Sequence, residues 1–167
     1  MKQITISEAQ KITSPNPITL VCVNTPVGIT NLTAVSWWTY LANRPPLIGF
    51  ALSKKSYTGE LILNNGKVVL SIPGEEIAEE AFQCGCFSGR DINKTEKLGI
   101  ELTETIEKFP IHSKLAFICI LENTVDVGDH TFFICRVNDI LYNEREKQLY
   151  SWGGYSKLAP LDQPTTV

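Results

Sequence analysis

Apolar residues gather in short runs along the chain, and polar stretches containing glycine, asparagine or proline separate these runs. The runs at residues 18–24, 47–53 and 67–73 have the length and composition of buried β-strands. Two longer runs, residues 115–126 and 130–142, flank the tripeptide Val127-Gly128-Asp129. This arrangement predicts two long strands joined by a tight hairpin.

Three segments between these runs are predicted to be short helices. Residues 58–63 end at Asn64-Asn65-Gly66, typical of a left-handed cap, and residues 75–84 begin with acids that suit a helix dipole. Residues 91–98 form the third. The segment of residues 29–46 has a mixed composition and ends with two prolines, which can continue neither an α-helix nor a β-ladder. Strands joined by short helices and closed by a long hairpin predict a mainly β fold, a β-barrel with helical decoration.

Composition narrows the class of protein. The 167 residues fit a single domain, residues 1–167, with a loose tail expected from about residue 159. The net charge of -3 gives no sign of a nucleic-acid partner. No apolar run approaches the ~20 residues that cross a bilayer, and the first ten residues lack the apolar core of a signal peptide. We therefore expect no membrane association and a cytoplasmic location.

The cysteines favour a reducing compartment over a disulfide framework. Of the five, Cys22, Cys119 and Cys135 lie inside apolar, strand-like runs, where a thiol behaves as a small hydrophobic group. Cys84 and Cys86 form a close pair that metal sites also use. Because only His112 and His130 are available to complete such a site, and no second close cysteine pair exists, we expect no metal. A packing role for Cys84 and Cys86 is favoured over a redox relay.

Three polar segments carry the candidate chemistry. Residues 53–58, SKKSYT, lie where a strand ends and a helix begins, so free backbone N–H groups, hydroxyls and two lysines would meet a phosphate there. The alternative is a polar loop that only caps the helix. Arg90 and Lys94 form a second anion-seeking pair that would share a helix face, the alternative being a solvated first turn paired with Asp91. Residues 31–38, NLTAVSWW, suit a flat heterocycle, although either tryptophan also suits a core or interface role.

Together these segments resemble the flavin reductase-like family of FMN-binding split barrels, which includes the flavoredoxins. The resemblance runs from about residue 15 to residue 158. It is carried, in the family's order, by NLTAVSWW, RPPLIGFALSKKSYT, KVVLSIPG, CFSGRDINK, VGDHTFF and YSWGGYSKL. It implies a six-stranded antiparallel split β-barrel of Greek-key type. It also implies a homodimer with one FMN per subunit near the interface.

The resemblance also assigns roles to residues. The segment beside the isoalloxazine ring is matched by Asn31, Thr33, Ala34, Ser36 and Trp37. The segment around the ribityl chain and phosphate is matched by Ser53, Lys54, Ser56, Tyr57 and Thr58. The motif that closes the phosphate site is matched by Ser88, Arg90 and Lys94. His130 matches a histidine on the side where nicotinamide docks, and Tyr155 belongs to a motif near the flavin pocket. No catalytic residue is assigned with certainty, since bound flavin supplies most of the chemistry.

Three activities fit these expectations. The first is an NAD(P)H-dependent flavin reductase, with NADH or NADPH as hydride donor to flavin N5 and a monooxygenase as a candidate partner. The second is a flavoredoxin-type carrier whose tightly bound FMN exchanges electrons with a redox protein. The third is a non-catalytic flavin-binding domain. No Gly-x-Gly-x-x-Gly fingerprint is present, so a nicotinamide would dock on the flavin face without a Rossmann unit of its own.

Overall fold

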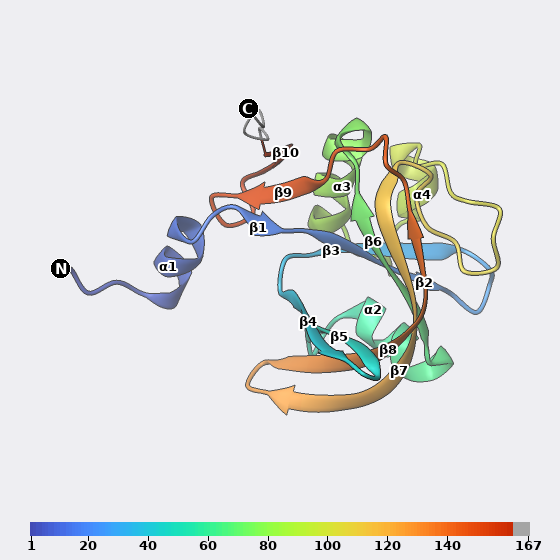
Figure 1. The fold of residues 1–167 in the computed structure, drawn as a ribbon, viewed down its shortest axis with the longest axis horizontal. Helices are drawn as coiled ribbons and strands as arrows, with labels where there is room; N and C mark the ends of the chain where they lie inside the picture. The colour runs from blue at the N-terminus through green and yellow to red at the C-terminus, as the bar shows by residue number, and fades with distance from the viewer. Residues whose placement is uncertain (162–167) are drawn as a thin grey trace.

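The computed structural model of the chain describes residues 1–161, and in this part ten strands and five short helical segments form a mainly β fold (Figure 1). The strands are β1 (Asn16–Pro17), β2 (Thr19–Asn24), β3 (Thr30–Val35), β4 (Trp38–Asn43), β5 (Pro46–Ser53), β6 (Lys67–Pro73), β7 (Ser113–Val127), β8 (His130–Tyr142), β9 (Leu149–Trp152) and β10 (Lys157–Pro160). The helical segments are α1 (Ile6–Ile12), α2 (Tyr57–Asn65), η1 (Glu75–Ile77), α3 (Ala78–Cys86) and α4 (Lys94–Leu98). None of the helices in residues 1–161 has the length and apolarity that a membrane crossing requires.

The strands form one large and one small antiparallel sheet. The large sheet has the order β3-β2-β6-β7-β8-β5-β4, and the small sheet has the order β1-β9-β10. Among the described residues β3 and β4 are the two edges of the large sheet and do not pair with each other, so the barrel is split, not closed. The mainly β split-barrel prediction is confirmed. The large sheet contains seven strands, one more than the six expected.

The long hairpin of β7 and β8 gives the sheet its curvature. Figure 1 shows both strands sweeping from one end of the molecule around to β5 at the other. Two register shifts, one after Ile118 and one after Leu121, interrupt the pairing, and such bulges bend and twist a strand. Gly128 in the connecting turn has a φ of 60°, a conformation that glycine adopts without steric cost. The predicted hairpin is therefore confirmed.

Each face of the sheet buries its own hydrophobic core. One core lies between the curved sheet and α2 and contains Phe50 and Phe133, whose rings stack with centroids 5.4 Å apart. The second core lies under α3 and α4 and includes Cys84, together with residues of β2, β3, β9 and β10. All five cysteines are free, and only Cys86 is exposed.

Several predicted boundaries require correction. The segment predicted as one helix over residues 75–84 is a 3-10 turn, η1, followed by α3. The helix predicted over residues 91–98 begins only at Lys94, because Asn93 adopts an extended conformation and its side chain accepts the N–H of Glu96. Residues 159 and 160 of the expected tail belong instead to β10, which pairs with β9. Residues 162–167 of that tail lie outside the described residues.

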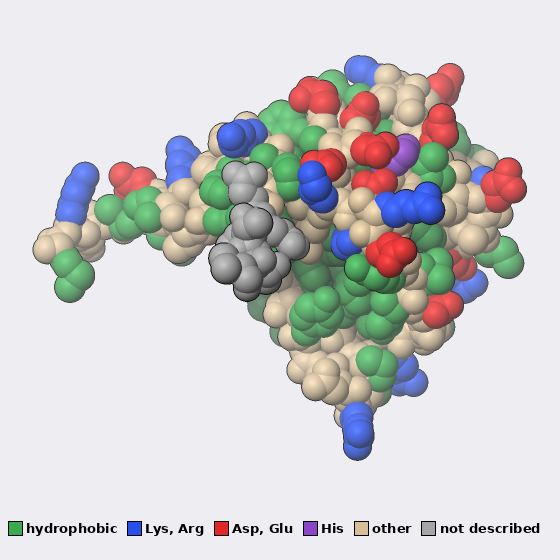
Figure 2. Space-filling model, turned by 45° about the horizontal axis from the view of Figure 1, so that its top comes forward, with side chains coloured by type: hydrophobic (Ala, Val, Ile, Leu, Met, Phe, Trp, Pro, Cys, Tyr) green, Lys and Arg blue, Asp and Glu red, His purple; other side chains and the backbone are tan. Residues whose placement is uncertain are grey.

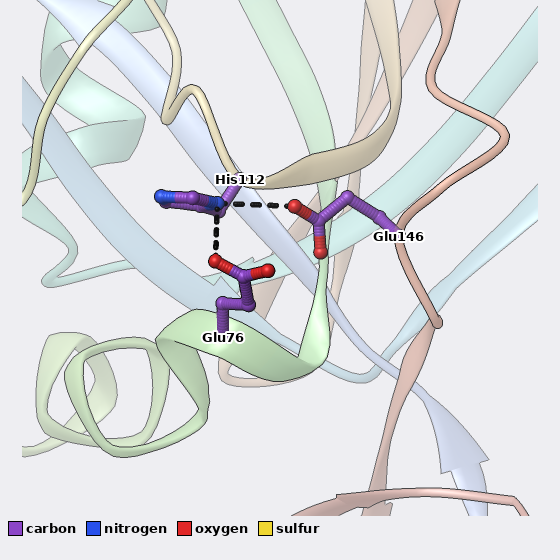
Figure 3. Close-up of side chains that lie close together, drawn as sticks. All are labelled: Glu76, His112 and Glu146. Carbon is purple, nitrogen blue, oxygen red and sulfur yellow. Dashed lines mark hydrogen bonds and ion pairs between the residues drawn. The ribbon is translucent and has the colours of Figure 1, made fainter.

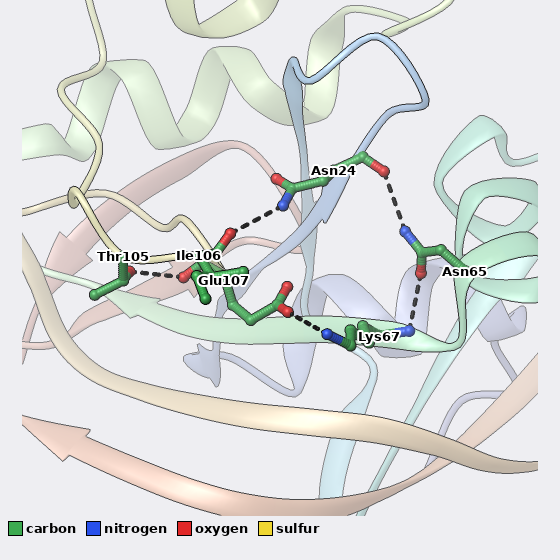
Figure 4. A network of polar contacts seen from close by, with 6 residues as sticks. All are labelled: Asn24, Asn65, Lys67, Thr105, Ile106 and Glu107. Carbon is green, nitrogen blue, oxygen red and sulfur yellow. Dashed lines mark hydrogen bonds and ion pairs between the residues drawn. The ribbon is translucent and has the colours of Figure 1, made fainter.

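A polar network anchors the irregular segment that follows α4 (Figure 4). Asn24 Nδ2 donates to the carbonyl of Ile106 at 3.1 Å, and Asn65 Nδ2 donates to the carbonyl of Asn24 at 3.1 Å. Lys67 Nζ pairs with the Glu107 carboxylate at 2.9 Å. The ends of β2, α2 and β6 thereby hold this segment in place.

We expect Phe133→Ala to lower the free energy of unfolding by about 3–5 kcal/mol, because it removes a fully buried ring and leaves a cavity against Phe50. Leu63→Ala on the exposed side of α2 is the control, and its cost should stay near about 0.5 kcal/mol. Urea unfolding of the three proteins measures both values. Equal losses for the two variants would contradict this description of the core.

Candidate functional site

A buried polar cluster joins the start of α2 to the edge strand β3. Ser56 caps α2 by accepting the N–H of Gly59. Thr58, in the first turn, is almost fully buried, and its hydroxyl accepts a hydrogen bond from Asn31 Nδ2 at 2.8 Å and bonds the Thr33 hydroxyl. The hydroxyl of Thr58 therefore holds β3 in position and does not face solvent.

The other atom of the Asn31 amide, Oδ1, lies against the backbone of Gly89 beside this cluster. This oxygen is buried and has no hydrogen-bond partner within residues 1–161. The backbone of Gly89 lies so close to this oxygen that a Cβ at position 89 would overlap it. A buried acceptor without a donor costs free energy, about 1–3 kcal/mol, so a ligand hydroxyl at this point would be stabilising.

A hollow, called here the Arg90 hollow, has a volume of about 370 Å³ and is lined by Asn31, Tyr57, Arg90 and Lys94 among others. The Arg90 guanidinium lies 5.0 Å from the centre of the Tyr57 ring, and its Nη2 pairs with Glu60. Because arginine carries five N–H donors, this pairing leaves others for an anion. Glu60 was not singled out in the sequence, where nothing links it to a residue thirty positions away.

Lys94 has a different role from the one its charge suggested. It is only 3% exposed, and its Nζ donates to the carbonyl of Leu32 at 2.7 Å and to that of Cys84 at 2.8 Å. Burial lowers the pKa of Lys94 and raises the pKa of the neighbouring Cys84 thiol to about 12. The expectation that Arg90 and Lys94 share a helix face is wrong, because Arg90 lies in a turn before α4.

The Lys94 contact also reveals which backbone groups of β3 are free. In an antiparallel ladder, residues alternate between bonding the neighbouring strand and pointing away from it. Since the Leu32 carbonyl points outward to Lys94, the N–H and C=O of Ala34, two residues on, also point away from β2. Ala34 therefore offers one donor and one acceptor at the open edge of the sheet.

A second hollow, the Trp37 hollow, opens along this edge. It has a volume of about 340 Å³ and is lined by Ala34, Ser36, Trp37, Gly85 and Tyr155, with Asn16 and other residues before β2. The Tyr155 hydroxyl already donates to the carbonyl of Phe82 at 2.8 Å, so its proton is not free for a ligand in the hollow. Tyr155 packs on α3, and its ring stacks on that of Phe82. The contribution of the segment before β2 had no signal in the sequence.

His130 and Trp37 lie together at one rim of this region. Their ring centroids are 5.0 Å apart, and His130 Nδ1 hydrogen-bonds the Asp129 carboxylate at 2.7 Å, which lowers the pKa of Asp129. Ser53 pairs with His130 across β5 and β8. The two rings are tilted by 42° to each other, and the exposed Trp37 ring offers a face of the kind on which an aromatic ring stacks.

Some expected binding residues lie outside both hollows. Lys54 pairs with Asp126 at 3.3 Å across the hairpin, and Ser53 Oγ accepts the N–H of Lys55. The exposed Ser88 Oγ accepts the N–H of Arg90 and so shapes the turn that carries the guanidinium. In the sequence these residues lie near those that line the Arg90 hollow, but their own side chains do not line it.

The two hollows suit the two ends of one elongated ligand. The Arg90 hollow offers a guanidinium and the start of α2 to an anion, while the Trp37 hollow offers aromatic faces and neutral hydrogen-bonding groups. β3 runs between them, and Asn31 and Ala34 are about 10 Å apart at roughly 3.3 Å per residue. The α3 helix lies against the same strand (Figure 1).

Comparisons with known proteins identify the family and the fold. The family described as Flavin reductase like domain matches residues 12–159. An uncharacterised protein of Pyrococcus abyssi is 33% identical over 117 residues, which cover 68% of this chain and 67% of the relative.

Two solved structures share the fold. The flavoredoxin of Desulfovibrio vulgaris (Miyazaki F) has a TM-score of 0.84 at 20% identity, covering 100% of this chain and 97% of its own. An FMN-binding protein from Thermus thermophilus, with bound p-hydroxybenzaldehyde, has a TM-score of 0.82 at 22% identity, covering 93% of this chain and 91% of its own. Because the family match extends from α1 to β10 and the split-barrel fold agrees with it, the chain belongs to the flavin reductase-like family.

Proposed function

We propose that this protein is an FMN-binding oxidoreductase in which the flavin lies along the open edge of β3. The observation that carries the proposal is the pairing of an anion-binding hollow with an aromatic hollow on one strand edge. FMN has this same polarity, with a phosphate at one end and a flat heterocycle at the other. The flavoredoxin and FMN-binding structures that share the fold support the assignment.

The residues present fit this cofactor. Arg90 and the start of α2 would hold the phosphate, and the buried Asn31 Oδ1 would accept a hydrogen bond from a ribityl hydroxyl. The outward N–H and C=O of Ala34 would meet the polar edge of the ring, with Ser36 and the rings of Trp37 and Tyr155 around it. When bound, FMN supplies reversible hydride and electron transfer.

We further propose that a reduced nicotinamide, NADH or NADPH, is the electron donor. The partly exposed surface of Trp37 and His130 adjoins the Trp37 hollow and would orient a second flat ring against the flavin. The contact with Asp129 fixes the orientation of the His130 ring. The cytoplasmic location expected from the sequence suits this donor, and the free, largely buried cysteines agree with a reducing compartment.

A homodimer would complete this arrangement. Large apolar side chains remain exposed on the strands β4, β7 and β8, among them Tyr40, Val125, Ile140 and Tyr142. A hollow of about 490 Å³ lies among Trp38, Tyr40 and Tyr142, and the buried Trp38 Nε1 has no acceptor within residues 1–161. A second copy would cover these groups and supply the acceptor.

We expect Arg90→Ala to weaken FMN binding by about 1.5–3 kcal/mol, the value of a charge-assisted hydrogen bond, which is roughly a tenfold to hundredfold rise in Kd. Lys55→Ala removes the same charge from an exposed side chain of the nearby loop and should leave the Kd within about twofold. Riboflavin, which lacks the phosphate, should bind the unmodified protein much more weakly than FMN. Fluorescence titration measures each Kd, and equal affinity for FMN and riboflavin would exclude this phosphate site.

We expect NADH or NADPH to bleach the visible flavin absorption of the FMN-loaded protein rapidly under anaerobic conditions. His130→Ala should raise the KM for the nicotinamide while the Kd for FMN stays unchanged, because the imidazole forms part of the donor surface and does not line the Arg90 hollow. Stopped-flow absorbance gives the dependence on nicotinamide, and fluorescence titration gives the Kd for FMN. Bleaching by a reduced protein donor, with none by either nicotinamide, would contradict the reductase and support a flavoredoxin-type carrier.

We expect sedimentation equilibrium to give twice the mass of the chain. Tyr40→Glu should shift the protein to the monomer, because it introduces a charge into the apolar surface that the second copy would bury. Ile106→Glu, on the exposed segment after α4, should leave the dimer intact. A monomeric unmodified protein at micromolar concentration would rule out the dimer.

A further inference from the structure

Three segments far apart in the chain bring ionisable side chains together near the C-terminal end of β6. Glu76 lies in η1, His112 precedes β7, and Glu146 lies in the connection between β8 and β9. Figure 3 shows the two carboxylates approaching the same imidazole from different sides. None of these residues lines the Arg90 hollow or the Trp37 hollow.

The geometry of this Glu76–His112–Glu146 cluster is close. His112 Nδ1 lies 3.0 Å from a carboxylate oxygen of Glu76 and 3.0 Å from one of Glu146. The three atoms all lie within 4.8 Å of one another. A single N–H group points well at only one acceptor, so the second carboxylate cannot gain an equally good hydrogen bond from it.

The charge and burial of these side chains favour the binding of a cation. Glu146 is 7% exposed, and its carboxylate fills the space where a side chain at Gly74 would otherwise lie. Even a protonated imidazole would cancel only one of the two negative charges. The neighbouring Lys147 pairs instead with Glu75 at 3.2 Å. Figure 2 shows several acidic side chains gathered in one region of the face drawn there, with basic side chains beside them.

We propose that the Glu76–His112–Glu146 cluster binds a divalent first-row metal ion, with Zn²⁺ as its simplest occupant. One imidazole nitrogen and two carboxylate oxygens form a ligand set that zinc accepts, with bonds of about 2.0–2.2 Å. Tetrahedral bonds of that length place neighbouring ligand atoms roughly 3.4 Å apart, close to the separations seen between Nδ1 and the two oxygens. Binding requires neutral His112 and leaves a fourth position for water.

The site is a metal centre that the sequence did not reveal. His112 was weighed there only as a partner for Cys84 and Cys86, and no spacing links it to glutamates 36 positions before and 34 positions after it. The ion would tie η1, the start of β7 and the β8–β9 connection together. It would also fix the start of α3, whose other end leads into the turn of Arg90.

Zinc titration of the metal-free protein tests the proposal, in a Cys86→Ser background that removes the one exposed thiol. Isothermal titration calorimetry should give one site per chain, and zinc should raise the Tm of this protein. Glu76→Gln, His112→Gln and Glu146→Gln should each weaken binding by about tenfold or more. Glu75→Gln, an adjacent glutamate outside the cluster, should change the Kd by less than about twofold.

Every other result of these experiments either supports or overturns the zinc-site proposal. Glu76 is the most exposed of the three ligands, so Glu76→Gln should fold even if the Glu146 variant does not. Absence of binding, equal binding by the Glu76 and Glu75 variants, or sulfur ligands in the zinc X-ray absorption spectrum would overturn the proposal. Nitrogen and oxygen ligands alone, with binding lost in Glu76→Gln, would support it. None of these readouts depends on flavin binding or on activity.

Discussion

The structure depends on which groups form hydrogen bonds with the backbone N–H and C=O groups at the open edge of β3. Among residues 1–161 this strand has one neighbour in the large sheet, so alternate N–H and C=O groups point away from the ladder and need other partners. The buried ammonium of Lys94 supplies one of them by bonding the Leu32 carbonyl. The same ammonium bonds the last turn of α3 at Cys84 and so fixes this helix beside the strand. The groups of Ala34 remain for a ligand.

This constraint explains why residues of separate segments form one site. Thr58 holds Asn31 and Thr33 from the α2 side, while Lys94 holds the strand from the α3 side. With β3 fixed from both sides, the backbone of Ala34 is left facing the Trp37 hollow, and the buried Asn31 Oδ1 is left without a donor among residues 1–161. A preorganised edge of this kind loses little conformational entropy on binding. The flavin proposal therefore depends more on the neutral edge than on the number of nearby lysines.

The sequence predicted the long strands, the β7–β8 hairpin and the cap at Gly66, because these are local patterns of apolar residues and turn glycines. It did not delimit β3 and β4, since these edge strands mix small polar residues with aromatics and give no simple alternation. The sequence indicated which residues could bind a ligand, but the role of each residue became clear only from the fold. Lys94 resembled a phosphate ligand and is instead a buried tie between two backbone segments, a role that no spacing in the sequence indicates. Glu60, paired with Arg90, was missed for the same reason.

The most direct measurement is amide hydrogen exchange along β3, with and without FMN. Ala34 should exchange quickly in the free protein and be strongly protected when FMN is present, because its N–H faces the ligand. Thr33, whose N–H faces β2, should already be protected and change little. An Ala34 amide that is equally protected in both states would contradict the account, as would one that stays unprotected at saturating FMN.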